Sequence, residues 1–340
     1  MAYRLKLKEP IGRAVKRIGR EQIERATTAL QASDAVDGIH QTRKAIKRLR
    51  ALLRLIRPGI EKAQYKQLNT ILGDAGRKLS ATRDREVLAR TIAGLMEAGE
   101  VPTRAARTAA DTLIASGSHA HVADADAARQ AARALLVEAG EAWLELKPDP
   151  DGFEVIAAGL ERGMTELAAA YSDGTRDDDE AIHDLRKCVQ RHWRHMQLLE
   201  AAWPGYFSAR AEEAEALSDL LGRSQDLTLL VHCLEAADPD AKKALDDLAK
   251  RAEKERKALR KLGQAHAARL VAESASSHAR RAQAYWDAAV AIKSASKSEV
   301  HAARTAAPAA AQPAIPEPVP PSRKRSPRAK AAKATKRGGN

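Results

Sequence analysis

The sequence predicts an all-α protein, and three observations support this fold class. Apolar residues make up 44% of the 340 residues, but only 3% are aromatic. Charged residues contribute another 30%. This mixture favours packed helices over sheets, which use more β-branched and aromatic side chains. In addition, no segment alternates apolar and polar residues for long enough to indicate a strand.

Helical segments follow one another from residue 10, and turn-forming residues separate several of them. The first segment begins at Pro10, where the missing N–H would have no intrahelical partner. The second ends at Pro58-Gly59, and later breaks fall at residues 148–150 and 172–174. We expect helices at residues 10–32, 39–57, 61–79, 84–98, 102–116, 123–146, 152–171, 180–202, 206–222, 226–236, 240–270 and 273–298.

Two blocks of sequence recur at nearly the same spacing. IHQTRKAIKR at 39–48 recurs as IHDLRKCVQR at 182–191, which places His40 and His183 143 positions apart. LSATRDREVL at 79–88 recurs as LGRSQDLTLL at 221–230, at an offset of 142. The shared offset indicates a duplicated helical unit of about 140 residues. We therefore expect one domain over residues 1–300, with two bundles at about 1–148 and 151–299 related by a pseudo-twofold axis.

The C-terminal segment differs from the rest of the chain. Residues 301–340 hold nine Lys/Arg and one acid, a net charge of +8, whereas the other 300 residues carry +5. The segment is rich in Ala and Pro without apolar periodicity, so we expect a disordered tail. Two interpretations stay open, an arm for DNA or another polyanion and a solubilising segment.

Without an apolar run of membrane-spanning length or a signal-peptide core, we expect a cytoplasmic protein.

The first copy of the repeat carries a basic stripe on one helix face. On a helical wheel the basic residues lie within about 80° of His40, and Ile46 and Leu49 lie on the opposite face. No acid occurs from residue 40 to residue 57. This first stripe consists of His40, Arg43, Lys44, Lys47, Arg48, Arg50 and Arg54.

The second copy repeats this pattern with fewer cations. Ile182 and Leu185 lie opposite the basic residues, Asp184 stands at the edge, and Gln190 takes the place of the first copy's Lys47. This second stripe consists of His183, Arg186, Lys187, Arg191 and Arg194.

Both stripes place like charges three and four residues apart, and each such pair lowers the stability of the helix by a few tenths of a kcal/mol. A solvated basic face is the simple explanation, but such faces usually intersperse acids, as residues 246–261 do. Arg grips phosphate oxygens bidentately and Lys supplies a compact charge. A row of both along a helix, at about 1.5 Å per residue, suits a long chain of phosphates. The recurring stripes therefore favour a polyanion site.

The motif around these stripes resembles the CHAD family, which is named for conserved histidines in an α-helical domain. The first copy has the H-x-x-R-K pattern at His40, followed by Arg83-Asp84 about 40 residues later. The second has it at His183, followed by Gln225-Asp226. The likeness covers about residues 5–298. The chain departs from the family pattern in the second copy, at Gln190, Trp193 and Gln225.

The resemblance implies two four-helix bundles with pseudo-twofold symmetry and a basic groove that binds inorganic polyphosphate. Bacterial members are associated with polyphosphate granules, and many carry a CYTH triphosphate-hydrolase domain. This chain resembles the stand-alone members, because its helical pattern begins by residue 10. We therefore expect a polyphosphate-binding protein at granules that is not an enzyme and needs no cofactor.

The roles of several other charged residues are predicted from their positions in the sequence alone. Asp84 and Asp226 each precede an apolar run, so we expect helix N-caps, with an ion pair to a stripe residue as the alternative. Four further cations are candidates for extending the basic surface, namely Arg77, Lys78, Arg83 and Arg210.

Three rival functions remain open. A Mg²⁺-dependent phosphoanhydride hydrolase would need acids beside the stripes, which the stripes lack. A general polyanion-binding or DNA-binding protein would use the stripes and the tail to link granule and nucleoid, although aromatic residues for base stacking are few. A scaffold would recruit granule proteins through its amphipathic helices.

A metal site at His192, His195 and Cys188 is not expected, because His192 falls on the apolar face.

Overall fold

The computed structural model describes residues 3–79, 81–98, 103–116, 124–174 and 178–306, and these residues form helices and no strand. The all-α prediction is confirmed. The helices are α1 (Ile11–Ala29), α2 (Ala35–Leu55), α3 (Lys62–Lys78), α4 (Ala81–Glu97), α5 (Arg104–Ser116), α6 (Asp124–Leu144), α7 (Phe153–Gly174), α8 (Asp179–Leu198), α9 (Pro204–Glu235), α10 (Pro239–Ala244), α11 (Asp246–Leu270) and α12 (Ala275–Ala306), with a 3₁₀ turn at Arg57–Gly59. Among the described residues, no helix is long and apolar enough to cross a membrane.

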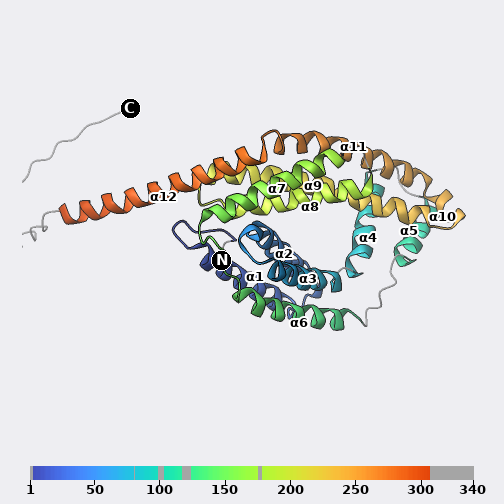
Figure 1. Ribbon diagram of the computed structural model, residues 1–340. Helices are drawn as coiled ribbons and strands as arrows, with labels where there is room; N and C mark the ends of the chain where they lie inside the picture. The colour runs from blue at the N-terminus through green and yellow to red at the C-terminus, as the bar shows by residue number, and fades with distance from the viewer. Residues whose placement is uncertain (1–2, 80, 99–102, 117–123, 175–177, 307–340) are drawn as a thin grey trace, which may run out of the picture. The chain divides into compact units, whose positions relative to one another are not determined.

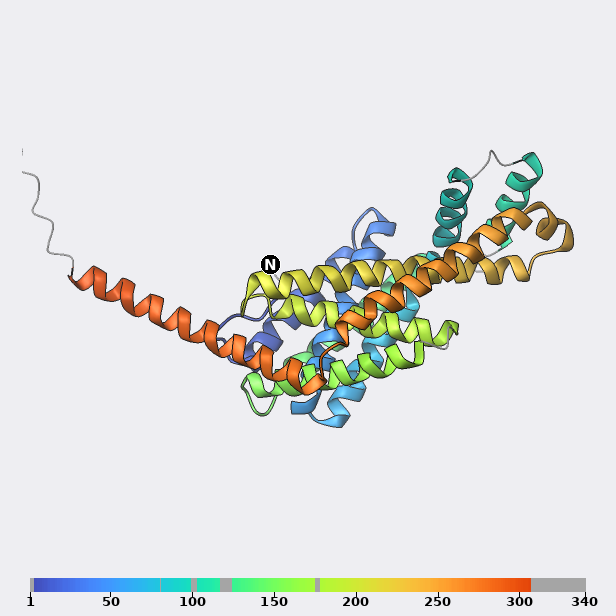
Figure 2. The ribbon, with the colours of Figure 1, turned by 90° about the horizontal axis from the view of Figure 1, so that it is seen from above.

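Residues 1–294 form one compact unit that contains two four-helix bundles (Figure 1). In the first bundle α1 packs on α2 and α6, and α3 packs on the same two helices. In the second bundle α8 packs on α7 and α9, and α11 packs on α9 and α7 (Figure 2). The predicted duplication is therefore visible in the packing, because α2 and α8 hold the repeated motif and occupy corresponding places.

The two halves of the chain share packing beyond these bundles. Helices α4 and α5 belong to the first half of the sequence, yet α4 packs on α9 and α11, and α5 packs on α10. Leu88, Ile92 and Leu95 of α4 are buried in one apolar cluster with leucines of α9 and α11. A third core therefore joins the halves that the repeat defines.

Both helices that carry the stripes begin at an aspartate cap. The Asp34 carboxylate accepts hydrogen bonds from the backbone N–H groups of Val36 and Asp37, each at 3.0 Å. The Asp178 carboxylate accepts from the backbone N–H of Ala181 at 2.7 Å. These caps satisfy N–H groups that a helix start leaves open. Because of its cap, α2 begins at Ala35, ahead of the predicted start at residue 39.

Several predicted boundaries are wrong. The break predicted between the helices at 206–222 and 226–236 does not exist, because α9 runs unbroken through it. Asp226 therefore lies inside α9 and Asp84 inside α4, so neither caps a helix. Buried residues on both sides of this segment, including Leu221 and Leu227, pack into neighbouring helices and keep the segment helical. Conversely, the helix predicted at 240–270 is interrupted at Leu245.

The last helix extends further than the sequence predicts. Helix α12 continues to Ala306, so the first six residues of the predicted tail, 301–306, are helical. The prediction of disorder is wrong for these six residues. The rest of the predicted tail, from residue 307 onward, lies outside the described residues.

Candidate functional site

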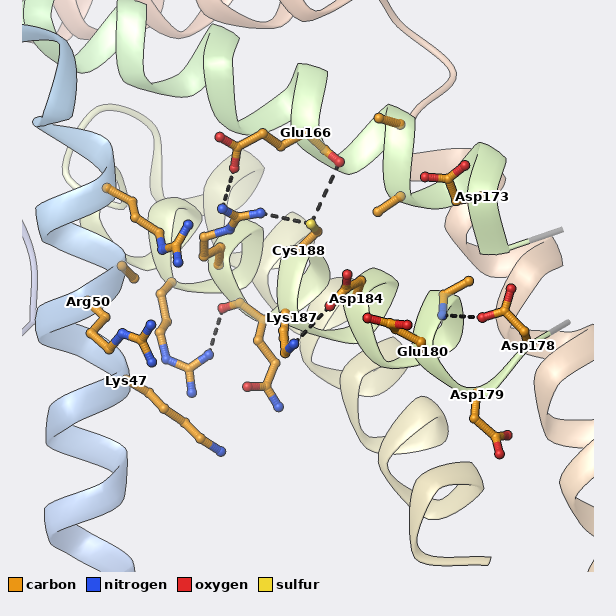
Figure 3. Close-up of a pocket in the computed structure, with 18 residues that line it drawn as sticks. Lys47, Arg50, Glu166, Asp173, Asp178, Asp179, Glu180, Asp184, Lys187 and Cys188 are labelled. Carbon is orange, nitrogen blue, oxygen red and sulfur yellow. Dashed lines mark hydrogen bonds and ion pairs between the residues drawn. The ribbon is translucent and has the colours of Figure 1, made fainter. Parts of the chain in front are cut away.

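An open cavity of about 1180 Å³ lies where α2 meets α7 and α8 (Figure 3). Helix α2 supplies one wall, on which Figure 3 shows Lys47 and Arg50 directed toward the cavity. The facing wall comes from α8 and the C-terminal half of α7. The basic residues that line the cavity come from both stripes: Lys47, Arg50 and Arg54 from the first, and Lys187, Arg191 and Arg194 from the second.

The cations of this basic region are crowded and partly removed from water. Burial lowers the pKa of Arg50, and the neighbouring guanidinium of Arg54 lowers it further. Burial likewise lowers the pKa of Arg194 to about 10, and only 6% of this residue is exposed. That pKa is still above neutral pH, so Arg194 stays charged. Like charges held this close favour an anion, which would relieve their repulsion.

Two arginine nitrogens in this region also lack a hydrogen-bond acceptor. The Nε atoms of Arg50 and Arg191 are buried, and neither has a partner among the described residues. The other contacts of Arg50 include a 3.3 Å hydrogen bond from its Nη2 to the side-chain oxygen of Asn69. An unsatisfied buried donor is costly, so the region is suited to a ligand rich in oxygen acceptors.

One carboxylate from α7 stands within the basic region. Glu166 forms an ion pair with Arg191 and a second ion pair with Arg162, at 3.1 Å (Figure 3 labels Glu166). Arg191 also donates to Cys188 Sγ at 2.8 Å. A small hollow of about 10 Å³ is lined by Glu166, Arg191 and Arg162, among others. Glu166 was not a predicted site residue, because α7 lies outside both repeated blocks.

The end of the cavity opposite α2 is acidic, which the stripes did not predict (Figure 3). The N-terminus of α8 brings several of these acids into the cavity, and some already have partners in the protein. Asp179 pairs with Arg260 and, at 3.1 Å, with Arg256, and Asp184 pairs with Lys187 at 2.8 Å. Within the described residues, no group of three or more His, Cys, Asp or Glu side chains is placed to hold a metal ion. The acidic lining residues at this end are Asp173, Asp178, Asp179, Glu180 and Asp184.

Two equivalent stripe arginines contact the next helix instead of lining the cavity. Arg43 donates from Nη1 to the carbonyl oxygen of Leu79 at 2.9 Å. Arg186 donates to the carbonyl oxygen of Ser218 at 3.2 Å and to Gln225 Oε1 at 2.6 Å. These contacts hold the end of α3 against α2 and hold α9 against α8. The first arginine of each repeated motif thus has a positioning role in the fold.

The remaining stripe residues lie outside the cavity as well. His40, Lys44 and His183 are exposed, and His183 Nδ1 lies 2.5 Å from Gln225 Nε2. Arg48 is half-buried, with its guanidinium 5.5 Å from the centroid of the Tyr3 ring. The structure therefore brings six of the twelve stripe residues together at the cavity and leaves the other six outside its lining.

The four additional basic candidates have separate environments. Arg77 and Lys78 are exposed at the end of α3, where Arg77 pairs with Asp74. The side chain of Arg83 lies outside the part of the chain that the structure describes. Arg210 is 3.7 Å from Glu273 and 3.5 Å from His192, away from the cavity lining. The three described candidates therefore do not line the cavity.

The histidines considered for a metal site have other contacts. His192 is buried, with its ring centroid 5.5 Å from that of His278. His195 is buried too, and its Nε2 lies 3.1 Å from the carbonyl oxygen of Ala51. Cys188 contacts Arg191 instead. The three side chains therefore contribute to three different local environments.

Comparison with known proteins identifies the family. The family model of the CHAD domain matches residues 17–235. The crystal structure of the CHAD domain from the plant Ricinus communis is similar, with 19% sequence identity and a TM-score of 0.47, over 85% of this chain and 95% of that chain. None of the curated proteins compared with the chain matches it. Because the family match spans more than half of the sequence, this chain belongs to the CHAD domain family.

Proposed function

We propose that this protein binds inorganic polyphosphate at the cavity between α2 and α8. One observation carries the proposal: the basic stripes of two separate repeats supply three cations each to the same cavity. Arg and Lys are the side chains suited to phosphate, because Arg offers a planar fork and Lys a compact charge. Membership of the CHAD family adds support, since polyphosphate binding is what the family resemblance implies.

A chain-like ligand fits the stripe better than a single phosphate does. The exposed residues His40 and Lys44 continue the first stripe beyond the cavity, toward the start of α2. From His40 to Arg54 a helix rises about 20 Å. A linear polyanion would contact the cavity cations and then follow these exposed residues. We further propose that such binding places the protein at polyphosphate granules.

We propose binding without hydrolysis, because two of the five acidic residues at the end of the cavity opposite α2 are already engaged in ion pairs within the protein. Asp179 is held by Arg260 and Arg256, and Asp184 by Lys187, so these carboxylates are engaged in ion pairs. Hydrolysis of a phosphoanhydride would need acids that hold Mg²⁺ beside the phosphates. Incubation of the full chain with polyphosphate and Mg²⁺ should release no orthophosphate above a protein-free control. Protein-dependent release would make the chain an enzyme.

The direct test compares the affinities of the full chain for different phosphate polymers. Long-chain polyphosphate, tripolyphosphate and duplex DNA are titrated at about 0.15 M salt, where surface charges are partly screened. The site variant changes Lys47, Arg50 and Arg54 to Gln. The control variant removes the same charge at exposed positions that do not line the cavity, Lys62, Lys242 and Lys243. Circular dichroism checks that both variants are folded.

We expect the site variant to bind long-chain polyphosphate at least about tenfold more weakly than the control variant, equivalent to about 1.4 kcal/mol. Polyphosphate should also bind more tightly than duplex DNA to the unmodified chain. Equal affinities of the two variants would place the site elsewhere. Equal affinities for polyphosphate and DNA would make the protein a general polyanion binder.

A further inference from the structure

We infer that Glu166 is an internal competitor that polyphosphate must displace from Arg191, and that Arg162 retains the displaced carboxylate. This inference rests on the proposed function, and it assigns a regulatory contact within the same site. Glu166 comes from α7, whereas the two basic stripes lie on α2 and α8. Glu166 therefore comes from outside both stripes, yet it forms an ion pair with one of their arginines.

The contacts of Glu166 show how it competes. Its Oε2 pairs with Nη1 of Arg191, which is one of the six cavity cations. The same residue lines both the cavity and the small hollow. A phosphate that binds Arg191 must therefore share or replace this ion pair, and it must also approach a negative charge. Both effects weaken the binding of phosphate.

A second arginine makes the displacement feasible without exposing an unpaired charge. The Oε1 atom of Glu166 accepts a 3.1 Å hydrogen bond from Nε of Arg162, one turn earlier in α7. Arg162 lines the small hollow but not the cavity. When phosphate takes Arg191, Glu166 can remain paired with Arg162. Arg162 then acts as a positioning residue for the carboxylate.

The matched test compares two substitutions in α7 with the same change of charge. Glu166→Gln removes the competing carboxylate, and Glu161→Gln removes an exposed carboxylate that does not line the cavity. We expect the full chain with E166Q to bind long-chain polyphosphate roughly tenfold more tightly than the chain with E161Q, the size of effect that one nearby charge produces. Thermal unfolding checks that both variants are folded, and E166A provides a second charge-removing variant.

A double-mutant cycle tests the role of Arg162. Arg162→Gln should weaken polyphosphate binding in the unmodified chain, and clearly less so in the E166Q background. A purely long-range attraction by Arg162 would give the same loss in both backgrounds, whereas coupled residues give different losses. Equal losses would therefore overturn the positioning role of Arg162.

The outcomes separate the competitor role from the proposed function. Polyphosphate binding that is tighter with E166Q than with E161Q supports the competitor role. If the unmodified chain binds polyphosphate but E166Q binds no more tightly than E161Q, the competitor role is overturned and the proposed function stands. If the unmodified chain does not bind polyphosphate at all, the proposed function fails, and the competitor role fails with it.

Discussion

His195 Nε2 in α8 lies 3.1 Å from the backbone carbonyl oxygen of Ala51 in α2, and this buried contact joins the two helices that carry the basic stripes. Ala51 stands between Arg50 and Arg54 in the sequence, and Arg194 immediately precedes His195. The contact therefore lies beside the cavity cations. It helps to fix the separation of the two stripes, on which the anion site depends.

The buried histidines should make the protein sensitive to mild acid. Burial lowers the pKa of His195 to about 3 and that of His278 to about 4, and it also lowers the pKa of His192. Because the unfolded chain takes up these protons near pH 6.5 and the folded chain does not, stability falls as the pH drops below about 6.5. At pH 5 the loss should be roughly 2 kcal/mol each for His195 and His278, whose folded-state pKa values lie below 5. Urea unfolding at pH 7.5 and at pH 5 measures this difference in unfolding free energy.

A single substitution isolates the contribution of His195. His195→Gln removes one titrating group while keeping a side-chain donor for the Ala51 carbonyl oxygen. We expect the difference in unfolding free energy between pH 7.5 and pH 5 to shrink by about 2 kcal/mol, the contribution of His195 alone. Carboxylates with lowered pKa values, such as Glu273, lose their contribution at more acidic pH, so they affect this window little. An unchanged difference would mean that His195 does not contribute.

Gly159 should be essential for the packing of α7 on the end of α2. A Cβ atom at this position would overlap the backbone carbonyl oxygen of Leu55, which cannot move without shifting the helix. We expect Gly159→Ala to lower the unfolding free energy by about 3 kcal/mol or more, the range of severe overpacking. Thermal unfolding followed by circular dichroism measures the effect.

The control for this prediction lies one turn along the same helix. At Gly163 the nearest neighbours of an added Cβ are His195 ring atoms at 3.5 Å, an ordinary contact distance. Gly163→Ala should be neutral or stabilise the protein by up to about 1 kcal/mol through helix propensity. Similar melting temperatures for the two variants would contradict the close approach of α7 and α2.

Changing Gln225 to Arg should lower the folding stability of the protein and add a positive charge beside the second stripe. Its Oε1 accepts a 2.6 Å hydrogen bond from Arg186, and its Nε2 lies 2.5 Å from His183 Nδ1. Gln225→Arg removes the acceptor and adds a second guanidinium, so stability should fall by about 2 kcal/mol. Long-chain polyphosphate should raise the melting temperature of this variant more than that of the unmodified chain. Equal increases would show that this end of the second stripe does not contact the ligand.

The basic tail should affect DNA binding more than polyphosphate binding. Its residues from 307 onward lie outside the described part of the chain, so this prediction depends on charge alone. Changing the nine Lys/Arg of residues 301–340 to Gln removes nine positive charges in the full chain. Duplex DNA affinity and its dependence on salt should both fall, because fewer counterions are released. Equal losses for DNA and polyphosphate would assign the tail to both ligands.

Much of the architecture is predictable because it depends on local patterns. The spacing of apolar residues predicts the helices, and the recurrence of the motif at His40 and His183 predicts a duplicated unit. Boundaries are less accurate where tertiary packing overrides local preference. The residues around Gly222 have the composition of a turn, yet buried leucines on both sides keep α9 continuous.

The amino-acid pattern alone specifies which residues form each basic stripe, because a helix of known period sets the direction of every side chain around its axis. The packing of the helices selects which of these residues act together. It directs Lys47, Arg50 and Arg54 into a cavity with cations of α8, and it uses Arg43 and Arg186 to hold neighbouring helices. A helical wheel contains no distance between helices. The placement of Glu166 beside Arg191 likewise depends on how α7 packs on α8, which neither repeated block contains.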